Sequence, residues 1–448
     1  MRCALISVLV TYLCIGVVPS VPAYEGLIDG TFGSSGLALT AVAKNSPISG
    51  PVVQDDGKVL FCGATDVAPS GTRVLVVRLT ASGTVDPDFH FTAFDFGAGP
   101  TASCTGIALQ NDGKIVVAGP GFNIARLLSD GTLDTVEFGG GTGKASVAFS
   151  AGAATGPVRV AIDAQQRIVL AGTIVTASHG DDFAIARFDS GGSPDLTFNL
   201  SGTVSYGFDT GGAGNNDIAT GLAIDSANRI VVGGYADAII SSHAFAILRL
   251  TEHGALDPNF GPGGKKSFVL GYTSNDDDRA LGLLIERGGG VVLVGRASIP
   301  DLTGDTGLSA VRLRDDGSLD TAFATAGKYQ PDLKLTDPTF AEGVAAIEQE
   351  NGKILFAGKT QIDAAGHSIA VTLRTNDDGS PDTSYGGNGE RSYDFALTSP
   401  SSQATFGLAF QGTQVIVANE AFATDGSNTT VAVLMRLSID LLFADGFE

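Results

Sequence analysis

Residues 220–271 carry one complete copy of the unit that decides the fold, TGLAIDSANRIVVGGYADAIISSHAFAILRLTEHGALDPNFGPGGKKSFVLG. The segment RIVVGG at 229–234 is apolar and ends in glycine, and the segment AFAILRL at 244–250 carries Arg249. A closing segment, HGALDPNFGPGG at 253–264, places Asp257 eight residues after that arginine. Short apolar runs bounded by glycine-rich turns predict strands, here at 220–225, 229–234, 244–250 and 265–271.

This unit recurs along the chain. The glycine-ended segment has counterparts in DGKVLFCG (56–63), DGKIVVAG (112–119), RIVLAG (167–172), GVVLVG (290–295), NGKILFAG (351–358) and the degenerate QVIVAN (414–419). Its arginine has counterparts at Arg78, Arg126, Arg187, Arg312, Arg374 and Arg436. Apart from one separation of 48 residues, successive arginines lie 61 to 63 residues apart. A fixed period of this length predicts a repeat architecture with seven units.

We predict that the recurring arginines form structural ion pairs. Arg249 shares a strand face with Phe245 and Ile247, because side chains alternate along a strand, so its charge needs a partner. The aspartate eight residues on can hold a guanidinium with two hydrogen bonds. The predicted pairs are Arg78–Asp86, Arg126–Asp134, Arg187–Asp195, Arg249–Asp257, Arg312–Asp320, Arg374–Asp382 and, between the two ends of the chain, Arg436–Asp29.

The pair Arg436–Asp29 predicts how the repeats close. The seventh unit lacks its closing segment, and a matching one, GLIDGTFG at 26–33, stands at the N-terminus. Such a split has no purpose in a linear solenoid such as a parallel β-helix, whereas in a ring it joins the ends. We therefore predict an all-β, seven-bladed β-propeller of four-stranded blades. Residues near Gly36–Thr40 should form the outermost strand of the last blade, beside the strand that carries Arg436.

These motifs resemble the delta-60 repeat, a bacterial family of secreted or surface-associated predicted propellers. The resemblance covers about residues 26–440. It implies the propeller fold and an exported location, and it implies no particular activity.

The two ends of the chain lie outside the repeats. Residues 1–23 combine Arg2, an apolar run at 4–18 and the small residues of Val21-Pro22-Ala23, which predicts a cleaved signal peptide and an exported protein that is secreted, periplasmic or on the cell surface. We assign 24–440 to the propeller and 441–448 to a short tail. In an oxidising compartment, Cys62 and Cys104 can form a disulfide between neighbouring blades, although buried free thiols are the alternative.

Composition narrows the partners and the chemistry. The net charge of −21 disfavours nucleic acid and anionic membranes, and no mature segment is predicted to span a membrane. The chain has no G-x-S-x-G, H-E-x-x-H or phosphate-loop motif. His179, His243 and His367, in loops of different units, are better interpreted as loop residues than as a metal site. The acidic loops 215–217 and 274–278 lack the D-x-D-x-D-G spacing, so calcium is only a minor alternative to a protein without cofactors.

We therefore predict a monomeric, non-catalytic binding propeller whose partner is an extracellular protein or glycan. Rigid scaffolds commonly carry function on their loops. The variable loops here are 64–74, 173–182, 235–244, 296–308, 359–369 and 420–430. The alternatives are a propeller hydrolase or lyase with a site at the central opening, and a purely structural surface protein. Converging His, Asp or Tyr side chains in a deep pocket would favour the enzyme.

Overall fold

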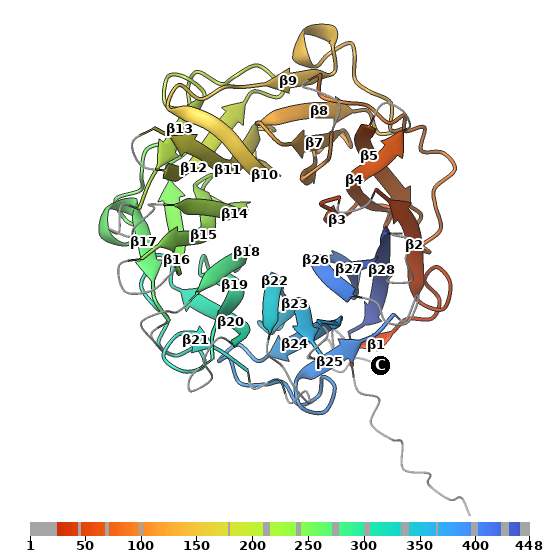
Figure 1. Ribbon diagram of the computed structural model, residues 1–448, viewed down its shortest axis with the longest axis vertical. Coiled ribbons are helices and arrows are strands. Elements are labelled where there is room, and N and C mark those ends of the chain that lie inside the picture. Colours follow the sequence, from red (N-terminus) through yellow and green to blue (C-terminus); the bar gives the residue numbers. More distant parts are fainter. Residues whose placement is uncertain are drawn as a thin grey trace, which may run out of the picture.

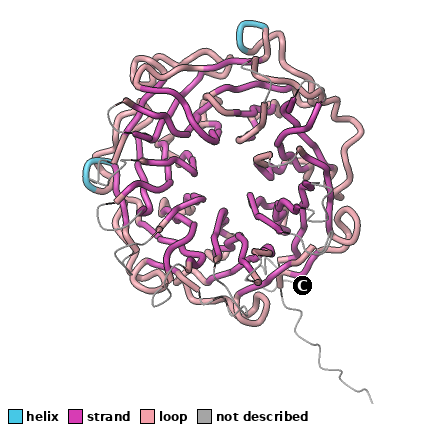
Figure 2. The backbone as a smooth tube through the Cα atoms, in the orientation of Figure 1, coloured by secondary structure: helices cyan, strands magenta, loops and turns pink. Residues whose placement is uncertain are grey.

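Seven antiparallel sheets surround a common axis in the computed structural model (Figure 1), and nearly all of the regular structure is strand (Figure 2). This confirms the predicted seven-bladed β-propeller. The structure describes residues 25–43, 46–67, 71–97, 102–177, 180–208, 216–238, 243–270, 277–299, 305–331, 333, 340–363, 366–395, 402–422 and 430–439. The predicted signal peptide 1–23 and the tail 441–448 lie outside these residues. Among the described residues, no helix is long and apolar enough to cross a membrane.

The strands of each blade follow one another along the chain, with the first strand nearest the axis (Figure 1). Blade 1 contains β3 (Ser49–Val53), β4 (Val59–Val67) and β5 (Gly71–Leu79). Blade 2 contains β6 (Gly106–Leu109), β7 (Ile115–Gly119), β8 (Asn123–Leu127) and β9 (Lys144–Ser146). Blade 3 contains β10 (Gly152–Ile162), β11 (Ile168–Thr176), β12 (Gly180–Phe188) and β13 (Thr203–Tyr206). Blade 4 contains β14 (Asp217–Ile224), β15 (Ile230–Asp237), β16 (His243–Leu250) and β17 (Lys265–Phe268).

The remaining blades have the same order. Blade 5 contains β18 (Arg279–Ile285), β19 (Val291–Ser298), β20 (Thr306–Leu313) and β21 (Lys328–Tyr329). Blade 6 contains β22 (Ala341–Glu348), β23 (Ile354–Gln361), β24 (Ser368–Thr375) and β25 (Glu390–Tyr393). Blade 7 contains β26 (Ser402–Gln411), β27 (Gln414–Phe422) and β28 (Thr430–Ser438), joined by β1 (Leu27–Ile28) and β2 (Leu37–Val42). Two 3-10 turns, η1 (Gly139–Gly141) and η2 (Pro262–Gly264), lie in closing segments.

The alternating strand directions give the ring two different faces. The turns between first and second strands and the closing segments between third and fourth strands emerge on one face, which we call the turn face. The loops between second and third strands, and those that lead to the next blade, emerge on the opposite face, which we call the loop face. The described parts of the predicted variable loops belong to the loop face.

The hydrophobic core is divided among the seven interfaces between blades. One buried cluster combines residues of blades 3 and 4, and another combines residues of blades 4 and 5, so that Val232 and Val231 of β15 pack toward opposite neighbours. The second strands are therefore apolar on both faces, which explains continuous runs such as RIVVGG. Blades also approach closely through glycine. A Cβ on Gly282 would lie 2.3 Å from the carbonyl oxygen of Val344 in the next blade.

The N-terminal segment closes the ring as predicted. Strand β2 pairs antiparallel with β28, with Leu37 opposite Met435 and Thr40 opposite Ala432. The short strand β1 pairs with the end of β28. Phe32, between these two strands, is completely buried in the core between blades 7 and 1.

Blade 1 departs from the predicted four-stranded pattern. Its sheet has three strands, and the fourth is reduced to one bridge between Val74 and Phe94. The segment that would form this strand packs instead through a row of rings, in which Phe94 contacts Phe91 and Phe96 at centroid distances of 6.0 and 5.7 Å. Ring packing replaces most of the backbone ladder at this edge.

Deletion of residues 24–42 tests closure of the ring. The deletion removes β1, β2 and Phe32 and leaves the outer edge of β28 unpaired. Loss of a buried Phe side chain alone costs about 3–5 kcal/mol, so we expect the melting temperature to fall by at least about 4 °C in a protein of this size. Deletion of 441–448 is the control and should leave the melting temperature unchanged. Equal melting temperatures for the two truncated chains would contradict this closure.

Candidate functional site

Each of the seven predicted arginine and aspartate pairs is in contact on the turn face. The distance from the arginine Nε to an aspartate oxygen is 2.7 Å for Arg78–Asp86 and 2.8 Å for Arg249–Asp257. The other intact pairs are Arg126–Asp134, Arg187–Asp195, Arg312–Asp320 and Arg374–Asp382, at 2.6 to 3.0 Å. Arg436 and Asp29, from opposite ends of the chain, approach to 2.8 Å. Geometry of this kind is typical of charge-assisted hydrogen bonds.

An aromatic ring lies under every one of these guanidinium groups. The sequence shows the aromatic residue near each aspartate, but its stacking on the arginine did not follow from the spacing alone. The guanidinium carbon lies 4.6 Å from the ring centroid for Arg249 over Phe260, and 5.0 Å for Arg374 over Tyr385. The equivalent rings are Phe89, Phe138, Phe198, Phe323 and Phe32. Cation–π attraction therefore adds to each ion pair.

The same arginines also join neighbouring blades. The Nη1 group of Arg249 in blade 4 donates to the carbonyl oxygen of Asp315 in blade 5 at 2.6 Å. Each acceptor lies three residues after the arginine of the next blade. The other acceptors are the carbonyl oxygens of Ser129, Ser190, Glu252, Asp377 and Ala81. We call this arrangement of arginine, aspartate, aromatic ring and carbonyl the arginine staple.

Arg374 is the exception among the seven arginines. Its guanidinium pairs with the carboxylate of Glu25, in the N-terminal segment, instead of with a carbonyl oxygen. The staple lowers the pKa of its aspartates. Burial opposes the shift, but hydrogen bonds from Thr31 and Gln414 and the charge of Arg436 bring the pKa of Asp29 to about 2. Repetition of the arginine, aspartate and aromatic ring in all seven blades, six of them with the carbonyl, indicates a structural role.

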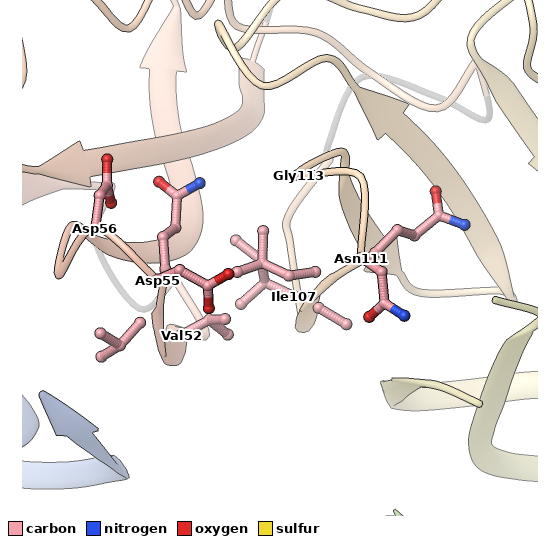
Figure 3. Close-up of a pocket in the computed structure, with 11 residues that line it drawn as sticks. Val52, Asp55, Asp56, Ile107, Asn111 and Gly113 are labelled. Carbon is pink, nitrogen blue, oxygen red and sulfur yellow. The ribbon is translucent and has the colours of Figure 1, made fainter. Parts of the chain in front are cut away.

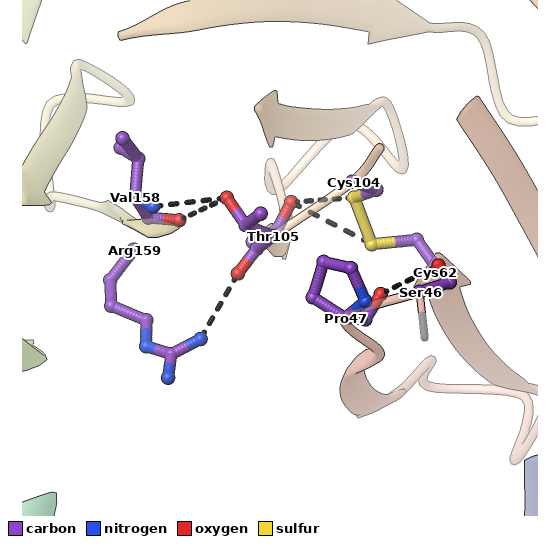
Figure 4. The surroundings of a disulfide bond; sticks show 8 residues. Ser46, Pro47, Cys62, Cys104, Thr105, Val158 and Arg159 are labelled. Carbon is purple, nitrogen blue, oxygen red and sulfur yellow. Dashed lines mark hydrogen bonds between the residues drawn. A yellow bond between two sulfur atoms is a disulfide. The ribbon is translucent and has the colours of Figure 1, made fainter. Parts of the chain in front are cut away.

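The two cysteines form a disulfide between blades 1 and 2 (Figure 4). Cys62 lies in β4 and Cys104 precedes β6, with their Cα atoms 5.7 Å apart. Both side chains are buried. The disulfide adds a covalent link at the interface where blade 1 has its shortened sheet.

The histidines do not converge. His243 of blade 4 contacts Asp277 at 2.5 Å, and His367 of blade 6 contacts Asp363 at 2.5 Å. His179 lies outside the described residues. Within the described ranges, no group of three or more His, Cys, Asp or Glu side chains could hold a metal ion.

The acidic loops considered for calcium are engaged by the protein itself in their described part. Asp217 and Asp278 are buried, and each accepts a backbone N–H at the start of its blade, from Phe208 and Leu270. The neighbouring Asp277 is the centre of a network of charged groups. Residues 215 and 274–276 lie outside the described chain.

This network runs across the loop face from blade 4 to blade 7, and we call it the loop-face band. Its members are Tyr235, His243, Asp277, Arg279, Arg296, Phe340, Glu342, Lys359 and Glu420. They come from the loop-face ends of β15, β16, β18, β19, β22, β23 and β27 and from the residues just before β18 and β22.

Asp277 holds one end of the loop-face band. Besides His243, it accepts from Arg279 Nε at 2.8 Å and from Arg296 Nη2 at 3.1 Å. Burial opposes ionisation, but these contacts hold the pKa of Asp277 well below its usual range. The guanidinium of Arg279 also lies over the ring of Tyr235, 5.1 Å from its centroid.

Glu342 and Glu420 continue the band into blades 6 and 7. Glu342 contacts Arg296 and Lys359, each at 3.2 Å, and both cations lie over Phe340. Burial raises the pKa of Glu420 to about 7, an effect that the charge of Lys359 only partly offsets. Among the described residues, Glu420 Oε1 has no hydrogen-bond partner.

The band breaks the symmetry of the repeat. The residue that follows the last position of the glycine-ended segment is Tyr235, Arg296, Lys359 and Glu420 in blades 4 to 7. At the same position, blades 1 to 3 have Ala64, Pro120 and Thr173. Features repeated in all blades build the ring, whereas features confined to some blades can serve recognition. Sequence reasoning missed the band because its members share no motif and are spread along the chain, with 185 positions between Tyr235 and Glu420.

A cavity of about 750 Å³ lies between blades 1 and 2 on the turn face (Figure 3). It is lined by residues 52–56, 107–111 and 113. Between blades 2 and 3, by contrast, the side chain of Gln166 bridges the two turns, because its Oε1 accepts a hydrogen bond from the backbone N–H of Asn111 at 2.7 Å. Blade 2 has Gly113 at that position, so no equivalent side chain bridges the turns of blades 1 and 2 among the described residues.

A smaller cavity of about 380 Å³ lies between the turns of blades 5 and 6 and contains Glu286. Burial raises the pKa of Glu286 to about 7. The attraction of Arg312, whose Nη1 lies 3.5 Å away, partly offsets the shift, and repulsion from Glu348 and Asp377 adds to it.

Comparison with known proteins supports a β-propeller family. Segments 54–89, 110–135, 167–198, 228–260 and 349–385 match the family described as "Domain of unknown function (DUF5122) beta-propeller". These segments cover the second and third strands of blades 1, 2, 3, 4 and 6 with the arginine and the aspartate of each pair. No curated protein matches the chain.

Solved structures resemble the chain at low identity. A structure titled "YCF48 bound to D1 peptide" has 11% identity and a TM-score of 0.44, covering 94% of this chain and 100% of that one. An ulvan lyase from a new polysaccharide lyase family has 10% identity and a TM-score of 0.49, covering 89% and 95%. A Trypanosoma rangeli sialidase has 9% identity and a TM-score of 0.38, covering 89% and 54%. Such similarity concerns the fold alone.

Substitution Asp257→Ala tests the arginine staple. It leaves the nearly buried guanidinium of Arg249 without its carboxylate, and removal of one partner of a buried pair costs about 3–5 kcal/mol. Asp88→Ala removes an exposed carboxylate of the same chemistry and should change the free energy of unfolding by less than about 0.5 kcal/mol. Chemical denaturation measures both. Equal losses in the two variants would show that the pair contributes no more than a surface charge.

Substitution Glu286→Gln tests the raised pKa of Glu286 through the pH dependence of the free energy of unfolding. A folded-state pKa of about 7 lies above the ordinary value of 4.5, so the folded protein binds the extra proton between these pH values and loses stability as the pH rises through them. The glutamine variant should match the wild type near pH 5. At pH 8 it should be more stable, by on the order of 1 kcal/mol after solvent screening. Glu350→Gln, in an exposed turn, is the control, and an identical stability difference at both pH values would refute the interpretation.

Proposed function

We propose that this protein is an exported binding module of the delta-60 type that recognises a charged extracellular glycan or protein through its loop face. The observation that carries the proposal is the loop-face band. It gathers charged and aromatic side chains from four consecutive blades. At the position of Tyr235, Arg296, Lys359 and Glu420, the other three blades have the small or apolar residues Ala64, Pro120 and Thr173.

The chemistry of the band suits recognition of a polar ligand. Arg296 and Lys359 lie over Phe340 and between carboxylates, so their charged groups are held in place before a ligand arrives. Pre-organised groups lose less conformational entropy on binding. The carboxylate of Glu420, at the end of the band, offers an acceptor to a ligand donor.

Catalysis is the less favoured alternative. An acid–base pair needs a group that can exchange protons near neutral pH, whereas Asp277 is held ionised by two arginines and His243. Glu420 has a suitable pKa. Glycoside hydrolysis, however, uses a pair of carboxyl groups, and among the described residues no second carboxyl group forms such a pair with Glu420.

Export is part of the proposal. The apolar N-terminal segment 1–23 has the features of a signal peptide, and a disulfide such as Cys62–Cys104 persists in oxidising compartments. The excess negative charge is compatible with an extracellular protein that does not bind nucleic acid.

Paired substitution of Arg296 and Lys359 by Ala tests the proposal. Immobilised acidic and neutral polysaccharides and purified secreted proteins serve as probes, with binding measured by surface plasmon resonance. We expect binding to at least one charged probe, reduced at least about tenfold in the variant and weakened by salt. Arg287→Ala, an exposed cation on the turn face, should bind as the wild type does. Undiminished binding by a folded double variant would exclude the band as the recognition surface.

A further inference from the structure

Arg159 is a long side chain at a position that other blades keep small. It pairs with Ala171 at the irregularity of β10, and the residues at the same register are Gly106, Gly221, Gly282, Ala345 and Gly407. The glycines are required there, because a Cβ on Gly407 would lie 1.9 Å from the carbonyl oxygen of Gly50 in the next blade. Blade 3 therefore departs from a strong packing rule.

The contacts of Arg159 hold it at the innermost strands of three blades. Its Nε donates to the carbonyl oxygen of Thr220 in blade 4 at 2.8 Å. Its Nη1 donates to the carbonyl oxygen of Thr105 in blade 2 at 3.1 Å, and Figure 4 shows the side chain reaching across from β10. Among the described residues, Nη2 has no hydrogen-bond acceptor.

Arg159 also lacks a counter-ion. Within the described ranges, no carboxylate lies within ion-pair distance of its guanidinium, although the side chain is half-buried. The turn-face arginines Arg167 and Arg229, by contrast, each contact two or more carboxylates. Burial lowers the pKa of Arg159 and no acidic neighbour offsets the effect. Arginine nevertheless stays protonated in proteins, so a positive charge remains near the axis without compensation.

We propose that Arg159 binds the carboxylate of a small organic acid or acidic sugar at the inner edge of blades 2 to 4. The fixed guanidinium presents Nη2 to the ligand, and a planar carboxylate matches a guanidinium edge. One cation neutralises one negative charge, and a protein of net charge −21 disfavours a dianion such as phosphate. This site is separate from the loop-face band, so its failure leaves the function proposed above untouched.

Titration of the arginine-labelled protein tests the site. The Nε resonance of Arg159, assigned with the variant Arg159→Lys, is followed by NMR while acetate or glucuronate is added at constant ionic strength. We expect saturable shifts with dissociation constants on the order of 1 mM, equivalent to about −4 kcal/mol. Glucose, the uncharged counterpart of glucuronate, should cause no shift, and phosphate should bind more weakly than acetate.

Two variants separate the site from a general effect of charge. Arg159→Gln should reduce the affinity for glucuronate at least about tenfold by calorimetry, while Arg287→Gln, which removes an exposed cation, should leave it unchanged. An unshifted Arg159 resonance in the wild-type protein would overturn the proposal and leave Arg159 as a tie between blades. This wild-type measurement decides the matter even if Arg159→Gln fails to fold.

Discussion

The arginine staple is the interaction on which the ring depends. Each staple satisfies a buried guanidinium with an aspartate of its own blade, an aromatic ring and a carbonyl oxygen of the next blade, as Arg249 shows with Asp257, Phe260 and Asp315. A buried guanidinium without such partners would carry a large desolvation cost. Because hydrogen bonds are directional, the staple fixes the orientation of each blade relative to the next. Apolar contacts between blades are less directional.

The junction of the two ends of the repeat array shows how strict this requirement is. At Arg374 the carboxylate of Glu25, in the N-terminal segment, takes the place of the carbonyl oxygen. Asp29 and Phe32 of the same N-terminal segment complete the staple of Arg436. A segment of fewer than twenty residues therefore completes the contacts of two arginines and the last sheet at once.

Repetition explains what the sequence could predict. The period, the spacing of arginine and aspartate and the split closing segment predicted the fold, the closure and the pairs, because each of these signals occurs several times. The inter-blade carbonyls could not be predicted, since a backbone acceptor such as that of Asp315 leaves no mark on residue type. The spacing of the repeat gave no sign that the fourth strand of blade 1 is reduced to one bridge, since this reduction depends on ring contacts of Phe94.

The candidate sites are the places where repetition fails. Asp277 was considered as a ligand for calcium, but it contacts Arg279, its neighbour in the chain, and also His243 and Arg296, which only the fold brings close. Arg159 did leave a signal in the sequence, because VRVAI at 158–162 stands where other units have TGIAL or TGLAI. Its lack of a counter-ion required the structure.

Hydrogen exchange of the variant Arg249→Gln, followed by mass spectrometry, tests the claim that the staple joins blades. If the staple joins blades 4 and 5, exchange should accelerate in β16 and in the turn of blade 5 that contains Asp315, while blades 1 and 7 stay protected. Faster exchange confined to blade 4 would contradict the account, because the arginine would then stabilise only its own blade.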